Sequence, residues 1–287
     1  MNNPAPSYIL TVVCPDKIGI VAAVAGYLSS RKYFIEESSH FGDRDTGTFF
    51  MRTRFTAPDS GFSWTSFAAG FDEIAEKFGI EWQVYDTAVL PRVLIMASRY
   101  DHCLNDLLYR YRTGALKMAI PAIISNHMDL AGLASWHKVP YFHIPVTTDT
   151  RQEAEERLMD IAGDTKAELI VLARYMQILS PAICTQYPGR IINIHHSFLP
   201  GFKGAKPYHE AHRRGVKLIG ATAHYVTADL DEGPIIEQTV ERADHTMSPD
   251  DLAATGRDVE SITLARAVKM HIEHRVFVNG SKTVVLR

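Results

Sequence analysis

The chain has 287 residues, 46% of them hydrophobic, so it can bury a substantial core and suits two domains. Its 30 basic and 33 acidic side chains give a formal net charge of −3. The sequence has no basic stripe with interleaved aromatic residues, which argues against a nucleic-acid partner and favours a small molecule.

The three cysteines, Cys14, Cys103 and Cys184, lie far apart and in no CxxC spacing, so we expect neither a disulfide framework nor a cysteine zinc site. Residues 1–6 lack the basic and apolar regions of a signal peptide. No apolar run reaches the roughly 18 residues of a membrane span. These features predict a soluble, cytoplasmic protein without membrane contact.

The first part of the chain predicts a small α/β domain over residues 1–86, followed by a linker over 87–91. Hydrophobic alternation and helical spacing indicate, in order, a strand at 8–14, a helix after Asp16, strands at 35–43 and 48–56, a helix at 64–77 and a strand at 81–85. The order βαββαβ is the split βαβ, or ferredoxin-like, arrangement.

The turn that closes the first strand, Cys14-Pro15-Asp16-Lys17-Ile18-Gly19-Ile20-Val21, resembles the opening strand-to-helix turn of ACT domains. The resemblance implies subunit pairing, as a homodimer or homotetramer, and a possible amino-acid effector. The residues that would contact this effector are Asp16, Lys17, Ile18, Gly19 and Ile20. The alternative is that Asp16 only caps the helix and Gly19 only permits close packing.

Residues 92–287 predict a second domain in which short apolar strands alternate with helices. The strands are expected at 92–98, 119–125, 141–145, 169–173, 191–193, 220–226 and 234–240, and at 275–278 or 283–286; the helices are expected at 104–111, 130–137, 151–165 and 249–274. This alternation indicates a doubly wound, mostly parallel α/β sheet, whose ligands bind beyond the carboxyl ends of its strands.

Asn193 and His195 stand at the end of an apolar run, residues 190–192, that is typical of a buried strand. Side chains two residues apart share one face of a strand, so these two should lie together. An amide can donate to an oxyanion, and an imidazole can carry a proton near neutral pH. With the Pro- and Gly-rich segment that continues to Tyr208, the pattern indicates acyl transfer or hydrolysis.

Asp231, in an acidic turn between two later predicted strands, can supply the carboxylate that orients the imidazole or the attacking water. Taken singly, a histidine after a strand is more often a structural hydrogen-bonder than a catalyst, and Asp231 is also explained as a turn residue. Four histidines, His195, His196, His209 and His212, are candidate metal ligands, but no nearby cysteine or well-spaced carboxylate completes a ligand set. In addition, the side chains of His195 and His196 would point apart if the chain were extended there. We therefore expect no metal, and expect His209 and His212 on a solvated helix face.

Taken together, these residues resemble the formyltransferase family that uses 10-formyltetrahydrofolate. Four motifs between about Pro91 and Arg242 carry the resemblance: Asn193-Ile194-His195-x-Ser197-x-Leu199-Pro200, then Gly204-Ala205-x-Pro207, then His224-Tyr225-Val226, then Asp231-x-Gly233-x-Ile235-Ile236. The resemblance implies that Asn193, His195 and Asp231 form the catalytic constellation.

The same resemblance implies a folate site framed largely by backbone groups. Its residues would be Met176, Gln177, Ile178, Leu179, Thr227, Ala228, Asp229 and Leu230. The alternative is that Met176, Ile178 and Leu179 pack as core beneath the sheet. Gln177 stands where glycinamide ribonucleotide transformylases have an arginine, so no charged contact is carried over to it.

The acceptor is indicated by residues 97–107, which contain no glycine and carry Asp101 where a phosphate loop would lie, so a phosphorylated acceptor is disfavoured. Methionyl-tRNA formyltransferases carry an additional basic C-terminal domain, whereas here the additional domain comes first. An ACT-like domain before a formyltransferase-like domain resembles the formyltetrahydrofolate deformylases. That resemblance implies water as acceptor, formate and tetrahydrofolate as products, and no permanently bound cofactor.

Three alternatives stay open at this point. The first is a formyltransferase acting on glycinamide ribonucleotide or another amine, and the second is an amino-acid-sensing regulator with an inactive second domain. Within a hydrolase, either His195 is the base and Asp231 orients it, or protonated His195 stabilises the oxyanion and Asp231 is the base.

Overall fold

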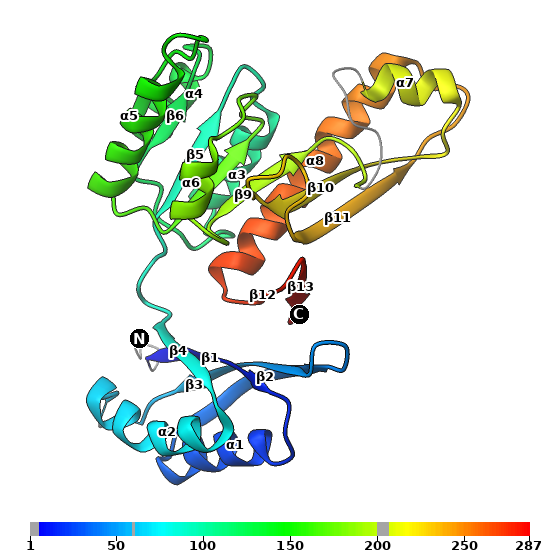
Figure 1. Cartoon of the computed structure of the whole chain (residues 1–287). Helices are drawn as coiled ribbons and strands as arrows, with labels where there is room; N and C mark the ends of the chain where they lie inside the picture. The colour runs from blue at the N-terminus through cyan, green and yellow to red at the C-terminus, as the bar shows by residue number, and fades with distance from the viewer. Residues whose placement is uncertain (1–5, 59–60, 200–206) are drawn as a thin grey trace. The chain divides into compact units, whose positions relative to one another are not determined.

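The computed structural model describes residues 6–58, 61–199 and 207–287 (Figure 1). The chain forms two compact units. The first comprises Met1–Leu90 with Glu273–Phe277 and Val284–Arg287, and the second comprises Pro91–Ile272 with Val278–Thr283. The division after Leu90 falls in the predicted linker, but two C-terminal segments that the sequence placed in the second domain belong to the first unit.

The first unit has the predicted βαββαβ order. Its elements are β1 (Ser7–Pro15), α1 (Ile20–Ser30), β2 (Phe34–Asp43), β3 (Thr48–Thr56), α2 (Trp64–Phe78) and β4 (Glu81–Asp86). The strands form an antiparallel sheet in the order β2-β3-β1-β4, and both helices lie on one face of it (Figure 1). The aromatic side chains of Phe55, Phe67 and Phe71 are fully buried in the core between them.

Two C-terminal segments complete the first unit. The guanidinium of Arg52, only 2% exposed, donates to the Glu273 carbonyl oxygen at 2.8 Å and lies 3.2 Å from a carboxylate oxygen of Glu37. Arg275 approaches the same Glu37 carboxylate at 2.8 Å, and Phe277 packs on the buried Phe50 with ring centroids 5.6 Å apart. Both arginines hold the pKa of Glu37 below its ordinary value, the hydrogen bond from Arg275 having the largest effect.

The second unit alternates strands and helices, as the sequence predicts. Its elements are β5 (Val93–Ala97), α3 (His102–Arg112), β6 (Ile123–Ser125), α4 (Ala131–Trp136), β7 (Tyr141–His143), α5 (Arg151–Asp164), β8 (Leu169–Ala173), α6 (Pro181–Gln186), β9 (Ile191–His195), α7 (Pro207–Arg214), β10 (Leu218–Tyr225), β11 (Ile235–Arg242) and α8 (Pro249–Ile272). A hairpin of β12 (Val276–Asn279) and β13 (Lys282–Val285) follows. Both terminal segments offered as alternatives are therefore strands, and α6 was not predicted.

The large sheet has the order β11-β10-β9-β8-β5-β6-β7. The five strands from β9 to β7 run parallel, and β10 and β11 add an antiparallel edge. Every residue of β5 and β8 is buried, as expected of strands covered on both faces. The chain leaves β5 toward β7 and returns to β8 on the other side of β5, so a topological switch point lies at the carboxyl ends of β5 and β8.

In the part of the chain that the structure describes, no helix combines the length and apolar character needed to cross a membrane.

The stability of the second unit should depend on pH through His271 of α8. The Tyr225 hydroxyl donates to Nδ1 of His271 at 2.7 Å, and burial lowers the pKa of this histidine from 6.5 to about 4. The folded state therefore binds fewer protons than the unfolded state between these pH values, so the free energy of unfolding should rise with pH across this window, by up to about 3 kcal/mol.

Urea denaturation at several pH values between 4 and 7 measures this dependence. His271→Gln should flatten the pH profile of stability, whereas His212→Gln, which changes an exposed histidine, should leave the wild-type slope. Equal slopes for the wild type and His271→Gln would contradict the assignment.

Candidate active site

The three predicted catalytic residues come together at the carboxyl end of β9. Asn193 and His195 share one face of this strand, and the adjacent strand β10 pairs antiparallel with it, so that His224 lies directly opposite Asn193. Asp231 comes from the turn between β10 and β11. The structure therefore joins Asn193, His195 and Asp231 and adds His224 to them.

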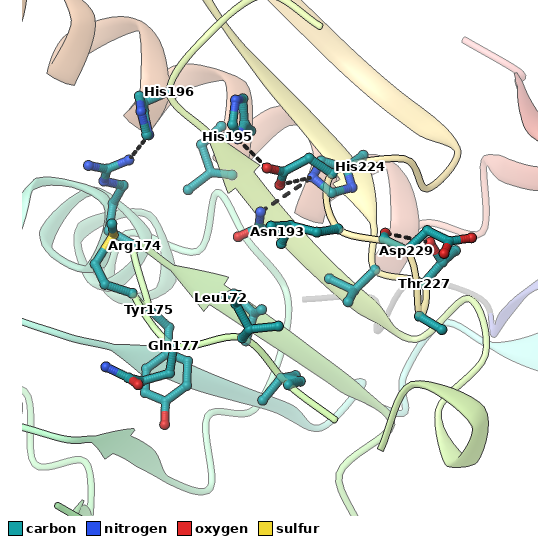
Figure 2. Close-up of a pocket in the computed structure, with 18 residues that line it drawn as sticks. Leu172, Arg174, Tyr175, Gln177, Asn193, His195, His196, His224, Thr227 and Asp229 are labelled. Atoms are coloured by element: carbon teal, nitrogen blue, oxygen red, sulfur yellow. Dashed lines mark hydrogen bonds and ion pairs between the residues drawn. The ribbon is translucent and has the colours of Figure 1, made fainter. Parts of the chain in front are cut away.

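A chain of polar contacts connects these four side chains (Figure 2). Nδ1 of His195 lies 3.2 Å from a carboxylate oxygen of Asp231, and Nε2 of His224 lies 3.6 Å from the other. Nδ2 of Asn193 lies 3.3 Å from Nε2 of His224. The chain Asn193–His224–Asp231–His195 thus links the amide to the imidazole through one carboxylate.

Hydrogen bonding fixes the proton positions in this chain. The Tyr225 carbonyl oxygen, 2.9 Å from Nδ1 of His224, can only accept, so this nitrogen carries a hydrogen. In neutral His224, Nε2 then accepts from the Asn193 amide, whose second N–H stays available. His195 donates from Nδ1 to Asp231, and its Nε2 is buried with no hydrogen-bond partner among the described residues. Nε2 is therefore the ring nitrogen of His195 that the contact with Asp231 leaves uncommitted.

The turn that carries Asp231 is sterically constrained. A side chain at Gly233 would lie 1.7 Å from the backbone oxygen of Tyr225, so only glycine fits there. Asp231 itself has a left-handed backbone, with φ of 58°, which costs a residue other than glycine about 1 kcal/mol or more. The hydrogen bond from His195 has the largest effect in holding the pKa of Asp231 well below its ordinary value, despite burial. Asp231 is therefore a fixed carboxylate at neutral pH.

A cavity opens beside this constellation, and all eight predicted folate-site residues line it. The segment 176–179 follows β8, and the segment 227–230 follows β10. In Figure 2, Gln177 lies at one margin of the cavity and Thr227 and Asp229 at another, with Asn193 between them. The two segments therefore enclose a space that opens directly onto the catalytic side chains.

The alternative of core packing holds for only one residue of the first segment. Leu179 is 8% exposed and belongs to the core of the sheet, whereas Met176 and Ile178 are more than half exposed. These two side chains are free to cover a planar ring, as a folate site requires.

The loop after β5 is not arranged to receive a phosphate. The buried hydroxyl of Ser98 donates to the Asn126 side-chain oxygen at 2.7 Å and accepts from the backbone N–H of Met176 at 3.0 Å. Asp101 immediately precedes the first residue of α3, so a negatively charged residue lies at the helix end that would otherwise attract an anion. Both observations agree with the prediction that this loop is no phosphate site.

The expectation that His195 and His196 point apart is wrong. β9 ends at His195, so His196 leaves the extended conformation, and the two rings stack with centroids 5.0 Å apart. His209 and His212 are exposed on α7, as predicted, and Glu210 on the same helix pairs with Arg213 and Arg214. The glycine-rich step at 204–207 falls mostly in residues 200–206, which lie outside the described part of the chain.

A different group brings potential metal ligands together. Among the described residues, His102, Cys103 and Glu260 place their ligand atoms within 4.8 Å of one another. Glu260, however, already accepts hydrogen bonds from His102 and Tyr208 and lies 3.3 Å from Nε of Arg174. Burial also raises the pKa of the Cys103 thiol, which disfavours the thiolate that binds metals. The group is better described as an ion network.

The residues proposed for an effector occupy the turn between β1 and α1. Gly19 precedes α1 with φ of 99°, and the side chain of Ile18 is fully exposed. Asp16 lies against Gly42, where a side chain would approach its carboxylate to 2.3 Å. The side chain of Ile20 is 1% exposed and packs in the core, so it cannot contact an effector.

Sequence reasoning missed His224 and Arg174 as site residues. His224 stood inside a quoted motif, but its role depends on the pairing register of β9 and β10, which the sequence does not reveal. Arg174 lines the cavity with a left-handed backbone, φ 61°, immediately after β8. A glycine would mark such a position in a sequence, and an arginine does not.

Comparison with known proteins places the second unit in a described family. The formyl transferase family model matches residues 91–268. Formyltetrahydrofolate deformylase of Corynebacterium sp. (strain P-1) is 47% identical over 98% of each chain. The crystal structure of formyltetrahydrofolate deformylase from Burkholderia mallei is 53% identical, with a TM-score of 0.93 over 98% of this chain and 100% of that one.

A more distant likeness covers the catalytic part. Glycinamide ribonucleotide transformylase 1 from Symbiobacterium toebii is 28% identical, with a TM-score of 0.65 over 71% of this chain and 97% of that one. The full-length matches, in contrast, include the N-terminal unit. The chain therefore belongs to the formyltetrahydrofolate deformylase family, whose catalytic part has the formyltransferase fold.

Proposed function

We propose that this enzyme hydrolyses 10-formyltetrahydrofolate to formate and tetrahydrofolate. The observation that carries the proposal is the Asn193–His224–Asp231–His195 chain, which opens onto a cavity lined by segments 176–179 and 227–230. Full-length likeness to proteins named formyltetrahydrofolate deformylase supports the same substrate. The reaction needs no permanently bound cofactor, because the folate is the substrate and water is the acceptor.

In the first step, water attacks the formyl carbon. His195 accepts a proton from this water at Nε2, while the carbonyl oxygen becomes an oxyanion that accepts a hydrogen bond from the free N–H of Asn193. The Nδ1–H of His195 points at Asp231, whose carboxylate stabilises the imidazolium that forms. His224 supports the step by holding the Asn193 amide in the donating orientation.

In the second step, the tetrahedral intermediate collapses. The bond from the formyl carbon to N10 breaks, N10 receives the proton from Nε2 of His195, and tetrahydrofolate leaves together with formic acid, which loses its remaining proton to solvent and becomes formate. The depressed pKa of Asp231 makes it a weak base, and Nδ1 of His195 already donates to it. These features favour His195 as base and then acid, with Asp231 as its orienting group, over the alternative in which Asp231 is the base.

Water is favoured over an amine acceptor such as glycinamide ribonucleotide. The hydroxyl of Ser98 is already hydrogen-bonded to the Asn126 side chain and the Met176 backbone, and Asp101 adds a negative charge beside the N-terminus of α3. A dianionic phosphate that approached the N-terminus of α3 would be repelled by this carboxylate.

Incubation of the purified protein with 10-formyltetrahydrofolate alone tests the proposal. We expect formate and tetrahydrofolate in equal amounts without an added acceptor, and no acceleration by glycinamide ribonucleotide. The His195→Ala variant, assayed in parallel, controls for spontaneous hydrolysis. Release of formate only when glycinamide ribonucleotide is present would instead identify a formyltransferase.

We further propose that the N-terminal unit pairs subunits into a homodimer or homotetramer and binds an amino-acid effector at the turn formed by Asp16, Lys17, Ile18 and Gly19. Exposure of the Ile18 side chain in this turn supports the proposal. Initial rates with a panel of amino acids, and sedimentation of the free protein, test it.

The three free, buried cysteines agree with a cytoplasmic location.

A further inference from the structure

Arg174 and His196 lie on the other side of His195 from His224 (Figure 2), and they belong to a cluster of polar side chains. It consists of Arg174, His196 and Glu260, with His102 and Tyr208 as further donors to Glu260. None of these five residues has a part in the reaction steps described above. Their connection to His195 runs through the stacked ring of His196.

Glu260 is the anchor of this cluster. It is 1% exposed on α8, and it accepts hydrogen bonds from Nε2 of His102 and from the hydroxyl of Tyr208, both at 2.8 Å. Burial alone would raise its pKa, but the His102 hydrogen bond and the positive charge of Arg174 together hold the pKa below its ordinary value. The buried group is therefore a carboxylate, and it needs the arginine as its counter-ion.

Arg174 spans the distance from Glu260 to His196. Its Nε lies 3.3 Å from the Glu260 carboxylate, and its Nη1 lies 2.6 Å from Nδ1 of His196. Its guanidinium also lies over the ring of Tyr100, 5.4 Å from the centroid. The left-handed backbone of Arg174, φ 61°, is unfavourable for an arginine, and such conformations persist where several contacts impose them and are frequent at functional sites.

The contact with Arg174 determines what His196 presents to its neighbour. A guanidinium only donates hydrogen bonds, so Nδ1 of His196 must accept, and the ring is uncharged in this arrangement. The His196 ring lies 5.0 Å from that of His195 with an interplanar angle of 20°. An uncharged ring at this position can support an imidazolium on His195, whereas a second imidazolium would repel it.

We propose that Arg174, held by Glu260, is a positioning residue for His195. It fixes the ring of His196, and His196 in turn holds the stacked ring of His195 with Nδ1 toward Asp231 and Nε2 toward the substrate. His195 is then restrained from two sides, by Asp231 through a hydrogen bond and by His196 through stacking. The inference rests on the proposed hydrolysis, in which His195 transfers the proton.

Steady-state formate release by the full-length Arg174→Ala variant tests the proposal. We expect kcat to fall at least about tenfold while KM and the affinity for tetrahydrofolate stay within about threefold of wild type. Added guanidinium chloride, at concentrations well below denaturation, should restore at least about fivefold of the lost kcat, because it replaces the missing group. Arg174→Lys should stay impaired, because one ammonium cannot reproduce the two-sided contact of the guanidinium.

Arg213→Ala is the matched control, since it removes an arginine from an exposed pair with Glu210, and it should keep wild-type kcat and show no response to guanidinium. If Arg174→Ala does not fold, the Glu260→Gln variant tests the proposal instead. Its kcat should fall at least about threefold at unchanged KM, whereas Glu210→Gln should keep the wild-type kcat. A folded Arg174→Ala variant with wild-type kcat, with its loss confined to KM, or with no guanidinium response would overturn the proposal. Absence of formate release by the wild type would instead refute the hydrolysis itself.

Discussion

Replacing Asp231 by asparagine should lower kcat for formate release by about 10³- to 10⁴-fold while leaving tetrahydrofolate affinity nearly unchanged. The carboxylate accepts the Nδ1–H of His195 and thereby leaves Nε2 free to take a proton. An asparagine amide can donate to Nδ1 instead, which would move the ring proton to Nε2 and abolish the base. The cavity segments 176–179 and 227–230 are not altered by this change.

Asparagine is the informative substitution because of the backbone at this position. Asp231 has φ of 58°, a conformation that asparagine adopts about as readily as aspartate and that alanine does not. Asp258→Asn, which changes an exposed carboxylate on α8, controls for loss of charge. Single-turnover formate release together with equilibrium binding of tetrahydrofolate separates catalysis from binding. A variant that binds folate and turns over at the wild-type rate would remove Asp231 from the mechanism.

Replacing Asn193 by alanine should lower kcat by about 10²- to 10³-fold, the usual effect of losing one oxyanion donor. Asn193 has one amide hydrogen directed to His224 and another available for the substrate, so the loss should appear in kcat and little in KM.

A double-mutant cycle with His224 sharpens this second prediction. If His224 acts by orienting Asn193, then His224→Ala should lower kcat strongly in the wild-type background and only weakly in the Asn193→Ala background. Additive losses would show that the two residues act independently. A folded Asn193→Ala variant with nearly wild-type kcat would exclude Asn193 as the oxyanion donor.

The sequence predicts those parts of the site in which reactive side chains follow the periodicity of a single strand. Asn193 and His195 are two residues apart at the end of an apolar strand, so their common face follows from strand geometry. Asp231 entered through its place in an acidic turn and through the family resemblance. The folate segments were identified through the family resemblance alone, and both line the cavity.

The site residues that the sequence did not predict depend on contacts between segments that are distant in the sequence. The register of β9 and β10 sets His224 against Asn193, and a register irregularity between Ala223 and His224 affects the pairing of β10 with β11. Glu260 reaches Arg174 from a helix whose sequence has a mixed pattern of buried residues. An arginine with left-handed backbone, finally, has no local sequence pattern that identifies it.

The composition of the N-terminal unit has a consequence for how the protein is made. Arg52 donates to the Glu273 carbonyl oxygen, and Phe50 packs on Phe277, so this unit can be completed only after residues 273–277 and 284–287 have left the ribosome. A fragment ending at Leu90 would expose Phe50 and leave the Arg52 guanidinium short of an acceptor. Ligand studies on that fragment would therefore describe a partly uncovered sheet, and the intact chain is the proper subject for them.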